Sequence, residues 1–117
     1  MVGIAMADSF SLRQSLEEGS TILHLVGEIT ADAEEQLIGS YAQLNPTDSQ
    51  RVILDFADTR YINSSGIAIL IQLINRAQDD GRTIEFATLS DHLRKIMDVV
   101  GLTEFVHIFR DLNEALS

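Results

Sequence analysis

The sequence predicts one α/β domain with a mixed, mostly parallel sheet of four to five strands and about four helices. Two observations lead to this prediction. After an opening pair of strands, segments with strand character alternate with segments of helical periodicity, which is typical of parallel strands joined by right-handed crossovers. The 117 residues have the length of one domain and contain no internal repeat or linker. We therefore treat residues 1–117 as a single domain.

An antiparallel hairpin is expected at the start. Apolar and polar side chains alternate over residues 10–16, as in an edge strand with one solvated face, and residues 21–26 form the partner strand, which Gly27 closes. The polar segment between the two strands contains Gly19, which suits a turn. Residues 1–8 are expected to be a loosely ordered start.

The first helix is expected over residues 30–44. Thr30 suits its cap position, and acidic residues follow, where they favour the positive end of a helix. The segment 45–49 contains the single proline of the chain and ends this helix. A stripe of apolar side chains faces the core along the helix, and it consists of Ala33, Leu37, Tyr41 and Leu44.

Strands and helices then alternate to the end of the chain. Residues 52–54 are a continuous apolar run, as in a strand that is covered on both faces, and further strands are expected at 83–89 and 105–109. Ser90 and Asp111 are the predicted caps of two helices that run to about residues 100 and 116. The inward side chains of the first of these helices are expected to be Leu93, Ile96, Met97 and Val100.

The helix over residues 64–80 is unusually apolar. Its Ile69 and Leu73 lie four positions apart, which suggests either an exposed ridge for a protein partner or a contact with a neighbouring element. The predicted core stripe of this helix consists of Ile67, Leu70, Ile71, Ile74 and Ala77.

The charge and composition exclude several classes of function. Eight Lys and Arg residues stand against 18 Asp and Glu, and a net charge of −10 disfavours binding to nucleic acid. The chain has no cysteine, which excludes disulfides and thiolate chemistry and suits a reducing compartment. No apolar run has the length of a membrane span, and the start lacks the pattern of a signal peptide. A cytoplasmic, monomeric domain that binds no membrane is expected.

The loop before the apolar helix is the most informative place for chemistry. Ser64 and Ser65 stand at the expected helix start with Gly66 behind them. Free N–H groups and the positive end of the helix dipole meet at such a place, so a phosphate added there would be stabilised. Alternatively, Asn63 or Ser64 only caps the helix, which contributes about 1 kcal/mol.

Three segments resemble the STAS domain of bacterial anti-sigma factor antagonists. Residues 52–70, VILDFADTRYINSSGIAIL, are similar to the central signature of that family, in which a buried strand and a short loop precede Asp-Ser-Ser/Thr-Gly-Leu. Residues 25–29, LVGEI, resemble its second strand and Gly-Glu turn, and residues 96–105, IMDVVGLTEF, resemble its helix, Gly-Leu and aromatic segment. This sequence departs from the pattern at Asn63, where the family has Asp.

The resemblance implies a protein-binding switch and not an enzyme. In this family the unphosphorylated antagonist binds an anti-sigma factor kinase of the GHKL type, phosphorylation of the first signature hydroxyl releases it, and a PP2C-type phosphatase restores it. The acceptor would then be Ser64, with Ser65 as second choice. A scaffold or regulatory STAS module without phosphorylation, in a signalling or transport assembly, is the alternative. The expected partner-binding residues are Asn63, Ser64, Ser65, Gly66, Ile67, Ile69, Leu70 and Leu73.

Three rival functions lack the residues they need. A phosphoaccepting receiver domain would use Asp55, but the one lysine, Lys95, lies inside a helix instead of following the last strand. A hydrolase using Ser64 lacks a Gly-x-Ser-x-Gly turn, and no histidine is placed as its base. The chain has no phosphate-binding Gly-x-x-x-x-Gly-Lys loop for a nucleotide. The three histidines lack metal-ligand spacing, so neither a metal nor a cofactor is predicted.

Overall fold

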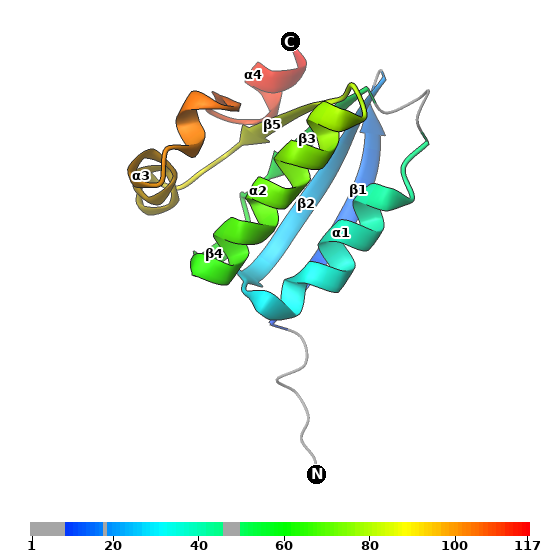
Figure 1. Cartoon of the computed structure of the whole chain (residues 1–117). Coiled ribbons are helices and arrows are strands. Elements are labelled where there is room, and N and C mark those ends of the chain that lie inside the picture. Colours follow the sequence, from blue (N-terminus) through cyan, green and yellow to red (C-terminus); the bar gives the residue numbers. More distant parts are fainter. Residues whose placement is uncertain (1–8, 18, 46–49) are drawn as a thin grey trace.

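The computed structural model describes residues 9–17, 19–45 and 50–117. The expected loose start at 1–8, part of the hairpin turn and the proline segment lie outside these residues. Within them the predicted alternation of strands and helices along the chain is confirmed. The strands form a mixed sheet that carries helices on both faces (Figure 1).

Over the described ranges the sheet has six strands, and most of its pairings are parallel. The strand order is β1-β2-β3-β5-β6, with β4 paired to β2; β1 and β2 are antiparallel, and the other pairs are parallel. The strands are β1 (Phe10–Glu17), β2 (Ser20–Ile29), β3 (Arg51–Asp55), β4 (Thr59–Ile62), β5 (Thr83–Ala87) and β6 (His107–Phe109). The sequence predicts four to five strands, and the structure adds β4, whose residues the sequence pattern places in a loop.

The strand β2 continues past Gly27 instead of ending there, and its extra length pairs with β4. The register shifts between Gly27 and Glu28, and Gly27 has a positive φ of 98°. A Cβ at position 27 would overlap the carbonyl oxygen of Ser9, so this close backbone approach requires glycine. The extension of β2 carries Ile29 to the place where the next helix begins.

Four α-helices and two 3₁₀ turns complete the fold within the described residues. They are η2 (Ala31–Ala33), α1 (Glu34–Ala42), α2 (Ser64–Asp79), α3 (Asp91–Val99), η3 (Leu102–Glu104) and α4 (Leu112–Leu116). Ser90 and Asp111 cap α3 and α4 as predicted, accepting hydrogen bonds from Leu93 N and Glu114 N. Thr30 makes no side-chain cap, so that expectation was wrong: a 3₁₀ turn precedes α1.

The two faces of the sheet are covered unequally. Helices α1 and α2 lie on one face of the sheet (Figure 1). The main core lies under them and α3, and it includes the stripe predicted for the first helix, Ala33, Leu37, Tyr41 and Leu44. On the opposite face α4 packs Ala115 against Ile22 and Ile53 in a smaller cluster. Leu93 and Met97 of α3 are buried, but Val100, which directly follows the helix, is exposed, contrary to expectation.

Candidate functional site

The sheet positions the first turn of α2. Ile62, the last residue of β4, pairs with Ile29, the last residue of β2, and the N–H of Asn63 donates to the carbonyl oxygen of Ile29 at 3.3 Å. At the first residue of β4, the Thr59 hydroxyl donates a hydrogen bond to the carbonyl oxygen of Leu25 in β2 at 2.7 Å. The helix therefore starts at a place that is fixed by two strand ends.

Asn63, and not Ser64, caps α2. The Oδ1 atom of Asn63 accepts a hydrogen bond from the N–H of Gly66 at 2.9 Å, and its backbone oxygen accepts one from Ile67 N at 2.9 Å. Of the two capping possibilities in the sequence, the structure selects Asn63. Ser64 is consequently the first residue of the helix, and its hydroxyl is not used for capping.

The two serines present their side chains to solvent. Ser64 and Ser65 are both exposed, and neither hydroxyl forms a hydrogen bond with the residues that the structure describes. Their backbone N–H groups lie in the first turn of α2, where the positive end of the helix dipole favours an anion. An enzyme can reach either hydroxyl without unfolding the helix.

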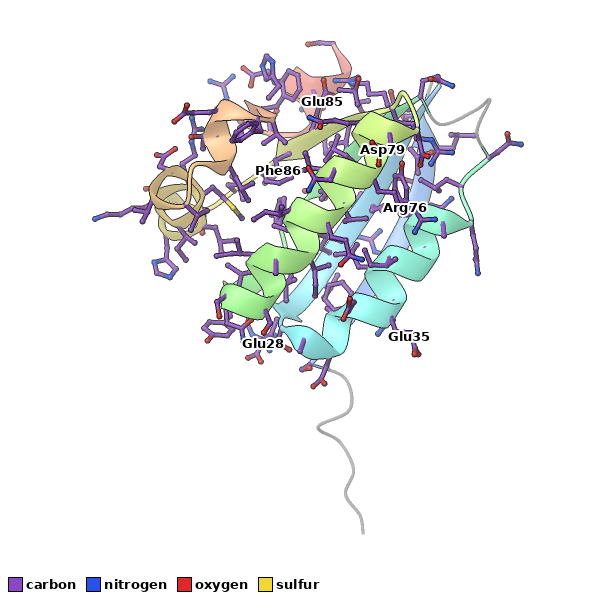
Figure 2. All side chains as sticks on the ribbon, viewed as in Figure 1. Glu28, Glu35, Arg76, Asp79, Glu85 and Phe86 are labelled. Atoms are coloured by element: carbon purple, nitrogen blue, oxygen red, sulfur yellow. The ribbon has the colours of Figure 1, made fainter. Side chains whose placement is uncertain are left out.

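A charged pair lies beside this helix start. Arg60 of β4 and Glu28 of β2 form an exposed ion pair, with 3.5 Å between the guanidinium nitrogen and the carboxylate oxygen. Glu28 lies at the end of the molecule where α2 begins (Figure 2). The Glu28 carboxylate offsets the charge of Arg60, so the pair as a whole offers a phosphate on Ser64 no net positive charge.

The expected ridge on α2 is absent. Ile69 is 3% exposed and Leu73 is fully buried, as is Leu70, so these three residues cannot contact a partner directly and their assignment to the binding surface was wrong. Ile67 is half-buried. The site that the structure assembles at the helix start consists of Asn63, Ser64, Ser65 and Gly66.

An apolar groove that the sequence did not predict lies further along α2. Ile71, expected in the core, is 41% exposed, and together with Val100 and the 70% exposed Phe105 it lines a cavity of about 220 Å³. The sequence predicts a strand that starts at Phe105, but Phe105 directly follows η3, and β6 begins only at His107. We call the surface formed by Ile71, Val100 and Phe105 the α2–α3 groove.

The described part of the chain contains neither a helix that could span a membrane nor a cluster of metal ligands. Among its helices, none is both long and apolar enough to cross a membrane. Within the same residues, no group of three or more His, Asp or Glu side chains is arranged to hold a metal ion.

Comparison with known proteins gives the family of this chain. The family model described as "Mlab, STAS domain" matches residues 12–110, which is most of the sequence. The chain therefore belongs to the STAS domain family, as the signature around Ser64 indicated.

Solved structures share the fold at low sequence identity. A sulfate transporter family protein from Wolinella succinogenes is 19% identical, with 87% of this chain and 85% of that chain covered and a TM-score of 0.78. An anti-sigma factor antagonist from Mycobacterium paratuberculosis is 20% identical, with 93% and 92% covered and a TM-score of 0.76. The Bacillus cell fate determinant SpoIIAA in its phosphorylated form is 17% identical, with 89% and 94% covered and a TM-score of 0.65.

Proposed function

We propose that this STAS domain is an anti-sigma factor antagonist whose docking to a protein partner is controlled by phosphorylation of Ser64. The observation that carries the proposal is the state of the Ser64 hydroxyl, which is exposed at the first residue of α2 while Asn63 performs the capping. Ser65 is the second-choice acceptor. The similarity in fold to a protein solved in a phosphorylated form supports the same assignment.

The docking surface would extend from Ser64 along the solvent face of α2. Ser64, Ala68, Ile71 and Asn75 recur at helical spacing and are all exposed, and this face leads to the α2–α3 groove. A partner that covers this surface removes the Ser64 side chain from water. Burying a phosphate dianion there without an opposing cation costs several kcal/mol, enough to break a micromolar complex.

The partners follow from this mechanism. The unphosphorylated domain binds an ATP-dependent anti-sigma factor kinase of the GHKL type, that kinase releases it by phosphorylating Ser64, and a PP2C-type phosphatase reverses the step. The domain itself acts as a substrate and a binder, in the cytoplasm, as a monomer. Asn63 stands in place of the aspartate of the family pattern, so one negative charge beside the phosphate is absent. Its absence reduces the electrostatic repulsion in the phosphorylated form.

The acceptor can be identified directly. The domain is incubated with a candidate GHKL kinase and ATP, and the phosphate is located by mass spectrometry, with Ser64→Ala and Ser65→Ala as matched variants. One phosphate on Ser64 that disappears only in Ser64→Ala supports the assignment. Phosphorylation of Ser65 alone moves the switch to the second-choice residue, and an unmodified chain argues against the switch.

A second candidate is a STAS module that binds its partner without phosphorylation in a transport assembly. The observation that favours it is the fold similarity to a sulfate transporter family protein. In that case a charge at position 64 would still weaken docking, but no kinase would modify the serine. The phosphorylation experiment therefore separates the two candidates.

A further inference from the structure

Three side chains from adjacent strands form a hydrogen-bonded chain on the sheet face opposite α1 and α2. The Oγ atom of Ser15 in β1 lies 3.0 Å from Nε2 of His24 in β2. The Nδ1 atom of the same histidine lies 2.8 Å from Oδ2 of Asp55 in β3. Leu23 and Leu25 point into the main core, so His24 between them points to the other face.

The strand registers bring these distant residues together. His24 is paired directly with Asp55 in the parallel β2–β3 ladder. In the antiparallel β1–β2 ladder His24 is paired with Arg13, so Ser15 lies on the adjacent diagonal of the same face. Neither contact involves the helix start that carries Ser64.

The hydrogen bonds orient the histidine as a base toward the serine. The Asp55 carboxylate can only accept, so Nδ1 of His24 donates the hydrogen bond between them. In the neutral tautomer that has its proton on Nδ1, Nε2 is the atom that accepts from the Ser15 hydroxyl. Asp55 is held in turn, because its side chain is 7% exposed and its Oδ1 accepts from the N–H of Ala57 at 3.2 Å. This connectivity is the one in which a histidine, oriented by a carboxylate, activates a serine as a nucleophile.

The serine is reachable and a cation lies near it. Ser15 is half-buried on the edge strand β1, whereas α4 covers the other side of this face at Ile22, Ile53 and Ala87. Arg13 lies two residues before Ser15 on the same face, at about 7 Å along the strand. It is exposed and belongs to none of the ion pairs found among the described residues, so its charge is available to a developing oxyanion.

We propose that Ser15 is an acyl-acceptor site, acylated by small activated esters with His24 as the general base. Ser15 Oγ forms a bond to the carbonyl carbon, and the hydroxyl proton passes to Nε2 of His24. The bond between that carbon and the leaving oxygen then breaks, and the leaving alcohol or phenol takes the proton. The products are acyl-Ser15 and the free alcohol, with one acyl group per chain. This assignment is independent of the proposed switch at Ser64.

The test treats the full chain with 4-nitrophenyl acetate and follows both the nitrophenolate released and the acetylated residue. We expect one equivalent of rapid release, with the acetyl group on Ser15 by peptide mapping. The release should disappear in Ser15→Ala and slow by about 100-fold in His24→Gln. Ser11→Ala is the matched control, because Ser11 lies on the same strand and face but has no histidine contact.

The acetylation rates of individual serines in the protein without substitutions test the proposal even if a variant fails to fold. In the native protein Ser15 should be acetylated at least ten times faster than Ser11 and Ser64, and this preference should vanish in urea, where the three side chains separate. Equal acetylation of Ser15 and Ser11 in the native chain would overturn the assignment. So would an acetyl group found on a histidine or on Lys95 but not on Ser15, or an unchanged rate in folded His24→Gln.

Discussion

The carbonyl oxygen of Ile29 occupies the place where a side chain of residue 66 would have to stand. A Cβ added to Gly66 would overlap this oxygen, and it would also lie 2.7 Å from Cγ1 of Ile62 and 2.8 Å from the Ile29 carbonyl carbon. The first turn of α2 therefore packs directly on the ends of β2 and β4. This contact fixes where Ser64 is presented.

Replacing Gly66 by alanine should destabilise the fold. The Ile29 backbone is part of the sheet and cannot move cheaply, so we expect Gly66→Ala to lower the free energy of unfolding by about 1–3 kcal/mol. Gly39→Ala in α1 is the matched control, because a Cβ there meets nothing within 4 Å. That substitution should raise the free energy of unfolding by about 0.5–1 kcal/mol. Urea denaturation measures both, and two similar values would contradict the close packing at Gly66.

The cap of α2 should depend on the side chain of residue 63. Asn63→Ala removes the acceptor for the Gly66 N–H, and we expect a loss of about 1 kcal/mol in the free energy of unfolding. Asn63→Asp keeps an oxygen acceptor at the same position and adds a negative charge at the positive helix end, so its stability should equal or exceed that of the original protein. A loss in Asn63→Asp as large as that in Asn63→Ala would show that the cap is not what holds the turn.

The ionisation of Tyr41 should destabilise the fold in alkaline solution. Its burial, and then the hydrogen bond that it donates to Asp80 at 2.7 Å, raise the pKa of the phenol above its ordinary value. The unfolded chain therefore loses this proton first as the pH rises, so the contribution of Tyr41 is complete below about pH 10 and declines above it.

Urea midpoints measured between pH 8 and pH 11 can test this. The original protein should lose more stability over this interval than Tyr41→Phe, which cannot ionise at position 41. Tyr61→Phe, which removes an exposed hydroxyl, is the control for the loss of a tyrosine. Parallel declines in the original protein and Tyr41→Phe would contradict the assignment.

The α2–α3 groove should matter for docking and little for stability. Phe105 is largely exposed, so Phe105→Ala should change the free energy of unfolding by no more than about 0.5 kcal/mol. We expect the same change to weaken partner binding at least tenfold, or about 1.4 kcal/mol, because an aromatic anchor is removed. Leu16→Ala, on the exposed edge of β1, is the control and should leave the affinity unchanged. Binding by Phe105→Ala that matches Leu16→Ala would exclude the groove from the interface.

Periodicity in the sequence predicted the elements better than the faces of the most buried helix. The stripe of α1 was correct, because polar residues separate its apolar positions. The helix α2 packs against α1 and β5 and is apolar on several sides, so its pattern could not distinguish the buried Ile69 and Leu73 from the exposed Ile71. The strand β4 was missed because its pairing depends on the extension of β2 beyond Gly27, a contact between distant segments.

The sites at Ser64 and Ser15 also differ in how far the sequence alone predicts them. Ser64 could be found from the chain itself, because a hydroxyl, a capping residue and a glycine stand next to each other. The contacts of Ser15 with His24 and of His24 with Asp55 depend on the registers of three strands, and no sequence motif indicates them. A site formed by neighbouring residues can therefore be predicted from this sequence, whereas a site formed by residues of three different strands can be found only in the structure.

The central claim is that charge on Ser64 decides whether a partner docks. The most direct measurement is the calorimetric affinity of a candidate GHKL kinase for Ser64→Ala and for Ser64→Asp. We predict that Ser64→Ala binds as tightly as the original domain, and that Ser64→Asp binds at least tenfold more weakly, because its carboxylate would be buried in the interface. Equal affinities of the two variants would contradict the account.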